Sequence, residues 1–370
     1  MRLLTINDLP SPGAACDFWQ KIAADPRPIV VYGTGNGADK LAMYLAERGR
    51  EISDFFASDG FCRGQSFHGK RVLSFAEIKE KYESFVILVA FGSTRSEVLS
   101  AVYALDEAYE LYVPELPLAE TALFDSDFYR LHYEEILRAY SLLADDVSRS
   151  VFVSIVLYRL SAEVCYLKNA TYGDDEAAIL RLANVKTAVD VGAYRGDTLL
   201  KWRREAPSLM RAYAIEPDAK NFIKLSVVAQ TMPFEVRLFN AAAFNEDKTA
   251  LFSQSGNRNA TLVLTGETAS YRHKTAEIAA VKIDTVLEGD TPDFIKYDTE
   301  GAEREALEGS AATIRAASPN LLVSAYHKSK DIFALPLQIE DAFPGVYRYY
   351  LRRTACIPGW ELNLLAVADK

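Results

Sequence analysis

The chain has 370 residues, more than one ordinary domain, which predicts two domains and a connector. Hydrophobic residues make up 49% and charged residues 25%, a globular composition that excludes disorder as the main state. A formal net charge of −10 disfavours nucleic acids and anionic membrane surfaces as partners.

The N-terminal sequence and the cysteines indicate a cytoplasmic protein. The first residues lack the apolar core of a signal peptide, and no stretch reaches the ~18 apolar residues of a membrane span. The four cysteines form neither a CxxC pair nor a metal-like spacing, so reduced thiols are expected. We therefore expect no membrane insertion.

Residues 1–117 form a first zone in which strand-like and helical segments alternate. The apolar runs 28–33, 52–58 and 85–91 read as strands, while 38–49 and 76–82 have helical periodicity. Such alternation predicts a parallel α/β sheet, here a Rossmann-like domain.

A glycine-rich turn follows the first strand of this zone. The turn fits the pattern GxGxx(G/A) between a strand and a helix, a context typical of dinucleotide sites, and an acid at the end of the next strand could hold a ribose. The segment 28–100 also resembles the small Rossmann-like N-terminal domains of sugar-modifying acetyltransferases. A bound nucleotide or nucleotide-sugar and a purely structural role both stay open. The candidate nucleotide-binding residues are Gly33, Gly35, Asn36, Gly37 and Asp59.

Residues 118–182 form a second zone that contains no proline and only one glycine. Residues 125–146 and 148–167 both read as helices, with Asp127 and Ser148 as expected N-caps. We interpret this zone as a helical connector that packs against one or both neighbours.

Residues 183–370 form a third zone that returns to α/β alternation. Most of its apolar strands are separated by helical stretches, which predicts a mostly parallel sheet. The last two strands are separated only by a short loop, which predicts an antiparallel hairpin. The expected strands are 187–192, 211–217, 234–242, 293–298, 320–327, 346–353 and 360–367.

The carboxyl ends of these strands carry the candidate cofactor residues, because ligands of open parallel sheets bind at that edge. The first strand leads into a turn with Asp190, Gly192 and Gly196, and glycines there let a ligand approach the backbone. Glu216 ends the second strand and stands where an acid can accept hydrogen bonds from both ribose hydroxyls. Together these residues predict a nucleoside site.

The turn also favours one kind of nucleoside cofactor over another. Tyr194 fills the place of a middle glycine, and the carboxylate of Asp190 would repel a pyrophosphate. A cofactor with an ammonium group and a sulfonium charge would suit this turn, which indicates S-adenosyl-L-methionine.

Over about residues 150–370, the sequence resembles the FkbM-type family of S-adenosylmethionine-dependent methyltransferases. The resemblance is carried in order by VDVGAYRGDT, AIEPD, DFIKYDTEGAEREALEGSAATI, SAYHKSKDIFALP and YYLRR. Tyr297 and Thr299 stand where apolar residues are more usual in the family. The resemblance implies a class I methyltransferase fold, with a seven-stranded, mostly parallel sheet that ends in an antiparallel hairpin. Some methyltransferases of this family also carry an N-terminal extension like residues 28–100.

The resemblance implies roles for individual residues. The first-strand turn would hold the cofactor and Glu216 would hold the ribose. Asn240 and Ala241, ending the third strand, would lie against the adenine, and Asp298 would face the methionine end or the acceptor. The implied cofactor-binding set is Asp190, Gly192, Ala193, Tyr194, Gly196, Asp197, Glu216, Pro217, Asn240, Ala241 and Asp298.

Methylation of a hydroxyl needs a base, and Asp298, Glu300 and His327 end the fourth and fifth strands. We take these three as candidate catalytic residues. The same three groups could instead hold a divalent metal ion, although their spacing is a weak signal and metal dependence is not the favoured expectation. Glu303 reads as a first-turn acid favoured by the helix dipole.

The sequence therefore predicts a methyltransferase that O-methylates a hydroxyl of a sugar, a glycan or a related natural product. Two alternatives stay open: an inactive nucleotide-sugar-binding or scaffold protein, and a nicotinamide-dependent oxidoreductase using the first zone. The acceptor is expected to be a small molecule or a glycan, and the loop 253–275 to help build its pocket. A homo-oligomer is compatible with the sequence.

Overall fold

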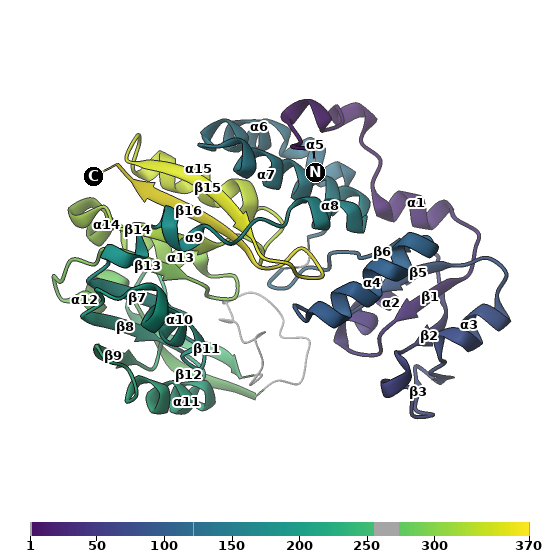
Figure 1. The fold of residues 1–370 in the computed structure, drawn as a ribbon, viewed down its shortest axis with the longest axis horizontal. Coiled ribbons are helices and arrows are strands. Elements are labelled where there is room, and N and C mark those ends of the chain that lie inside the picture. Colours follow the sequence, from purple (N-terminus) through teal and green to yellow (C-terminus); the bar gives the residue numbers. More distant parts are fainter. Residues whose placement is uncertain (1, 121, 255–273, 370) are drawn as a thin grey trace.

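A computed structural model describes residues 2–120, 122–254 and 274–369. Two sheets organise the chain, with a group of helices beside them (Figure 1). The smaller sheet has the order β2-β1-β5-β6, and all its pairs are parallel. Its strands are β1 (Ile29–Tyr32), β2 (Ile52–Phe56), β5 (Val86–Val89) and β6 (Leu111–Tyr112).

Helices cover both faces of the smaller sheet because its strands are apolar on both sides. The face that carries Val31 and Leu88 packs against α1 (Phe18–Ala24) and α2 (Asn36–Ala46). The face that carries Val30 and Ile87 packs against α3 (Phe75–Lys81) and α4 (Ser96–Ala108). A short hairpin, β3 (Ser66–Phe67) and β4 (Lys70–Arg71), stands beside this sheet.

The described part of residues 118–182 contains five α-helices, where the sequence predicted two long ones. They are α5 (Ser126–Leu131), α6 (Tyr133–Leu142), α7 (Asp146–Ser161), α8 (Val164–Asn169) and α9 (Glu176–Ile179). The expected N-caps were wrong by two and three positions, because the Asp125 and Asp145 carboxylates accept the backbone N–H of Phe128 and Ser148. Ser148 is instead buried inside α7, where its Oγ accepts the Leu351 N–H at 3.0 Å.

The larger sheet has the order β15-β16-β14-β13-β7-β8-β9, and β16 is antiparallel to both of its neighbours. The predicted mostly parallel sheet with a terminal antiparallel hairpin is confirmed. Sheet order reverses between β7 and β13, the place where ligands bind in open α/β sheets. The strands are β7 (Thr187–Val191), β8 (Arg211–Ile215), β9 (Glu235–Phe239), β13 (Phe294–Tyr297), β14 (Asn320–Ser324), β15 (Tyr347–Arg353) and β16 (Leu362–Ala368).

Helices pack around this sheet and place their N-termini near its ligand-binding edge. α10 (Asp197–Glu205) follows β7 directly, and α13 (Glu303–Glu308) follows β13. The remaining helices are α11 (Ala219–Ala229), α12 (Ile283–Leu287), α14 (Ala311–Ala317) and α15 (Asp331–Ala342).

A separate three-stranded sheet, β10-β12-β11, was missed by the sequence reasoning. It contains β10 (Ala241–Ala243), β11 (Lys248–Gln254) and β12 (Lys274–Val281). Ala241 was expected to end the third strand, but that strand ends at Phe239 and Ala241 begins β10. Most of the loop 253–275, expected at the acceptor pocket, lies outside the described residues.

The two large sheets and the helices share one hydrophobic cluster, which includes Val30, Phe152 and Ile295. Polar contacts add to this packing. Buried Arg159 of α7 pairs with Glu115 at 2.6 Å, and the backbones of Ser93 and Ile357 exchange two hydrogen bonds. Among the described helices, none is long and apolar enough to cross a membrane.

Candidate active site

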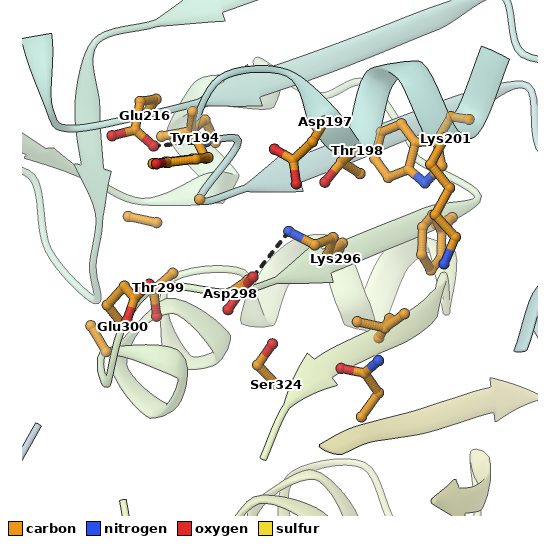
Figure 2. A pocket seen from close by; sticks show the side chains of 18 of the residues that line it. Tyr194, Asp197, Thr198, Lys201, Glu216, Lys296, Asp298, Thr299, Glu300 and Ser324 are labelled. Atoms are coloured by element: carbon orange, nitrogen blue, oxygen red, sulfur yellow. Dashed lines mark hydrogen bonds and ion pairs between the residues drawn. The ribbon is translucent and has the colours of Figure 1, made fainter. Parts of the chain in front are cut away.

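A cavity of about 260 Å³ opens at the reversal point of the larger sheet. Its walls come from the carboxyl ends of β7, β8, β13 and β14, from β10 and from the first turns of α10. Figure 2 shows its polar side chains, with Glu216 and Tyr194 toward one end and Lys201 toward the other. The predicted ligand edge is therefore hollow.

The turn after β7 requires glycine at two positions. Gly192 has φ +85°, and a Cβ there would lie 1.9 Å from the backbone oxygen of Asp298. Gly196 has φ +88°, and a Cβ there would lie 2.8 Å from the Val228 side chain. Tyr194 adopts φ +47° without being glycine, a conformation that costs energy and is frequent at functional sites.

Glu216 lies at the end of β8 and faces this turn. One carboxylate oxygen accepts the Tyr194 N–H and the other the Asp218 N–H, each at 2.8 Å. Burial raises the pKa of Glu216 to about 7, because a carboxylate loses its hydration there. The acid predicted at the ribose is thus held rigidly against the cofactor turn.

The other residues expected at the cofactor fall into two groups. Asp197 and Pro217 line the cavity, and so does Ala241 from β10. Asn240 is not among the lining residues. Its Nδ2 donates a hydrogen bond to the Glu216 backbone carbonyl at 2.8 Å and so fixes the end of β8. Ala193 is fully buried below the surface of the turn.

Asp190 is fully buried and pairs with a lysine that the sequence reasoning missed. Lys296 of β13 stands in register with Asp190 of β7, and its Nζ lies 3.2 Å from Asp190 Oδ1. The same Nζ lies 3.6 Å from Asp298 Oδ2. Burial raises the pKa of Asp190, opposed by the Lys296 charge. Burial would lower the pKa of Lys296, but the charges of Asp190, Asp298 and Asp197 outweigh it and raise that pKa.

His327 is 1% exposed and forms an ion pair with Glu303, the first residue of α13. His327 Nδ1 lies 2.9 Å from Glu303 Oε1, which also accepts the Thr299 N–H at 2.8 Å. Burial would lower the pKa of His327, but the charges of Glu303, Glu300 and Asp298 raise it to about 10. The His327 charge in turn lowers the pKa of Glu303 to about 2 against the effect of burial. Glu303 therefore anchors a charged histidine and does more than complement the helix dipole.

The other ring nitrogen of His327 points toward the remaining candidate catalytic residues. His327 Nε2 lies 3.4 Å from Glu300 Oε2 and 3.7 Å from Asp298 Oδ1. Asp298 and Glu300 line the cavity, whereas His327 lies behind them. Three buried atoms here, Asp298 Oδ1, Thr299 Oγ1 and His327 Nε2, have no hydrogen-bond partner within the described residues.

The acidic cluster has one set of groups spaced closely enough for a metal ion. Asp298, Glu303 and His327 each offer one ligand atom within 4.8 Å of the others. The sequence had suggested Glu300 in place of Glu303. Because Glu303 Oε1 already accepts from His327 and Thr299, the geometry is that of a hydrogen-bonded ion pair.

The glycine-rich turn of the smaller sheet is closely packed. A Cβ at Gly37 would lie 2.2 Å from the Ala90 carbonyl oxygen, and one at Gly33 would lie 3.0 Å from the Phe91 ring. Gly35 is the N-cap of α2, whose first residue is Asn36. Asp59 lies in the short turn Asp59–Phe61, and its side chain is outside the described part of the structure. Gly33 and Gly37 thus have packing roles, and a nucleotide at this turn stays a prediction.

Fold and cavity together define a methyltransferase-like α/β protein with a cavity at the reversal of its larger sheet. Residues 190–352 match the model of the family described as Methyltransferase FkbM domain. This match agrees with the resemblance that the sequence motifs indicated. No curated protein matches the chain.

Solved structures share this fold. The crystal structure of methyltransferase FkbM from Methylobacillus flagellatus KT is 19% identical, with a TM-score of 0.69, and the match covers 96% of this chain and 95% of that one. At this identity the likeness shows the fold alone, but it extends over both large sheets. Spermidine synthase from Thermotoga maritima (15% identity, TM-score 0.33, 53% and 56% coverage) and ribosomal protein L11 methylase from Lactobacillus delbrueckii subsp. bulgaricus (12%, 0.27, 52% and 76%) are too distant to support an argument.

Proposed function

We propose that this chain is an S-adenosylmethionine-dependent O-methyltransferase whose acceptor is a hydroxyl of a sugar, a glycan or a related natural product. The observation that carries the proposal is the arrangement of Glu216 against the glycine turn after β7, beside a hollow edge of the sheet. A ribose presents two hydroxyl donors, and an anchored carboxylate is their natural acceptor. Ile215 and the alanines of β10, which line the cavity, offer an apolar surface for an adenine.

Glu300, Asp298 and His327 support the catalytic half of the proposal. When bound, S-adenosylmethionine supplies an electrophilic methyl group on a sulfonium. Asp298 or Glu300 accepts the acceptor's hydroxyl proton, because both line the cavity. His327, already protonated at neutral pH, acts as a positioning residue whose Nε2 side faces these two carboxylates.

The acceptor class is supported by the unpartnered atoms beside the cavity. Asp298 Oδ1 can accept a hydrogen bond and Thr299 Oγ1 can accept or donate one, and buried polar atoms in folded proteins nearly always find partners. A molecule with neighbouring hydroxyl groups could satisfy both. A thiol is a weaker hydrogen-bond donor and acceptor than a hydroxyl, so these atoms favour a hydroxylated acceptor over a thiol.

Replacing Glu216 by alanine should weaken binding of S-adenosylhomocysteine by about 1.5–3 kcal/mol, or roughly 10–150-fold, the value of hydrogen bonds to a charged group. Calorimetric titration measures the loss, and Glu246→Ala, at an exposed acid outside the cavity, is the control. An unchanged dissociation constant would remove Glu216 from the ribose site.

Thermal shifts with S-adenosylhomocysteine, NAD and UDP-sugars test the competing functions, and a shift with NAD alone would reject the proposal.

Cofactor affinity should also depend on pH through Glu216. Its pKa of about 7 means that the carboxylate is largely protonated at pH 6 and ionised at pH 8. Only the ionised form accepts hydrogen bonds from both ribose hydroxyls, so affinity for S-adenosylhomocysteine should rise between pH 6 and 8 and then level off. In Glu216→Gln the same titration should be nearly flat across this range. A flat wild-type profile would contradict the assignment.

A further inference from the structure

We infer that Lys296 binds the carboxylate of the donor's methionine end and so makes the site selective for donors that carry this group. The inference rests on the proposed function, because it names the part of the cavity that reads one end of the same cofactor. The roles proposed for the glycine turn and for Glu216 do not explain why a lysine, Lys296, lines the cavity.

The Lys296 side chain lies at the centre of the cavity, and the buried carboxylate of Asp190 fixes its position. Because Lys296 and Asp190 are register partners on neighbouring parallel strands, their side chains emerge on the same face of the sheet. Asp190 is fully buried and does not line the cavity, while the Lys296 side chain is 15% exposed and does. Asp190 thus positions the ammonium, which reaches toward the space between Asp197 and Ser324 (Figure 2).

The charges of the donor indicate which of its groups Lys296 would bind. S-adenosylmethionine carries a sulfonium and an ammonium, both cations, and acids such as Asp197 and Asp298 suit them. The Lys296 ammonium is paired with Asp190 and Asp298, so its preference among ligand groups is local: a cation placed against its remaining N–H is repelled and an anion is attracted. The donor's single anion is its carboxylate, which is therefore the group that suits this position.

The ammonium of Lys296 has room for this role. Its Nζ donates a hydrogen bond to Asp190 Oδ1 at 3.2 Å and lies 3.6 Å from Asp298 Oδ2, so at least one of its three N–H groups is left for a ligand. Lys201 is the other lysine among the described lining residues. It lies toward the end of the cavity, is 45% exposed and pairs with Glu176 at 3.5 Å, so it is the less suitable receptor.

The test compares two ligands that differ only in the carboxylate, S-adenosylhomocysteine and its decarboxylated analogue S-adenosyl-3-thiopropylamine, by calorimetric titration of the full chain. Wild type should bind S-adenosylhomocysteine at least ~30-fold more tightly. In Lys296→Met this ratio should fall to within about threefold, with the decarboxylated ligand bound as tightly as before or more tightly. Lys201→Met should keep the wild-type ratio.

Each other result has a definite meaning. Equal binding of the two ligands by wild type overturns the inference and leaves the proposed function standing. Failure of wild type to bind either ligand rejects both. Loss of the ratio in Lys201→Met but not in Lys296→Met overturns the assignment to Lys296. If Lys296→Met does not fold because Asp190 loses its partner, the double variant Asp190→Asn/Lys296→Met removes both charges, and a wild-type ratio in it also overturns the inference.

Discussion

His327→Asn should lower kcat by at least about 100-fold while leaving the affinity for S-adenosylhomocysteine nearly unchanged. An asparagine amide can replace Nδ1 as the donor to Glu303, but it leaves nothing in the place of Nε2 beside Asp298 and Glu300. Alanine is a poorer choice, because an unpaired buried Glu303 would cost about 3–5 kcal/mol of stability. Single-turnover rates and calorimetric titration measure the two quantities separately.

A pH profile separates a positioning role of His327 from a merely structural one. Removing the histidine's positive charge makes neighbouring carboxylates harder to ionise, so the acidic limb of the kcat profile should move to higher pH. His68→Asn, at an exposed histidine of the short hairpin, is the matched control and should change neither rate nor profile. Wild-type kcat in His327→Asn, or a simultaneous loss of cofactor affinity, would contradict this assignment.

Gly192→Ala should destabilise the protein by more than about 3 kcal/mol and abolish cofactor binding. The new Cβ would lie 1.9 Å from the Asp298 backbone oxygen, and relief would require β7 and β13 to separate where Asp298 N–H donates to the Val191 carbonyl at 2.9 Å. The backbone adds its own penalty, because φ +85° is unfavourable for alanine. Melting temperature and S-adenosylhomocysteine titration measure the two effects.

Gly289→Ala is the control that separates the cost of the positive φ from the cost of the contact between Gly192 and the Asp298 backbone. Gly289 has φ +93°, but a Cβ there would meet nothing within 4 Å. The control should therefore lose only about 1–2 kcal/mol for the backbone conformation and should bind cofactor normally. Equal destabilisation by the two substitutions would mean that contact between the two strand ends does not explain the requirement for glycine.

The larger sheet and the position of its hollow edge were predictable because they depend on local signals. Short apolar runs gave the seven strands, and the position of Glu216 after the second of them placed it opposite the glycine turn. The class of fold followed from the parallel alternation and the final hairpin. Those inferences need only residue type and spacing.

The features that the sequence could not predict depend on contacts between distant residues. Lys296 lies within an apolar strand, and only its register with Asp190 makes it part of the site. The charge of His327 depends on Glu303, which reaches it from another element. The helix starts were misplaced because Asp125 and Asp127, like Asp145 and Ser148, are equally good caps by residue type, and packing decides between them.

The loop between β15 and β16 gives a distant part of the chain control over the shape of the cavity. Its Trp360 ring lies directly on Gly92, where a Cβ would come within 2.2 Å of the ring, while the neighbouring Glu361 and Asn363 line the cavity. The smaller sheet contributes none of the described lining residues. Residues that do not line the cavity can therefore influence its shape, and Gly92 is constrained although it lies outside every chemical motif.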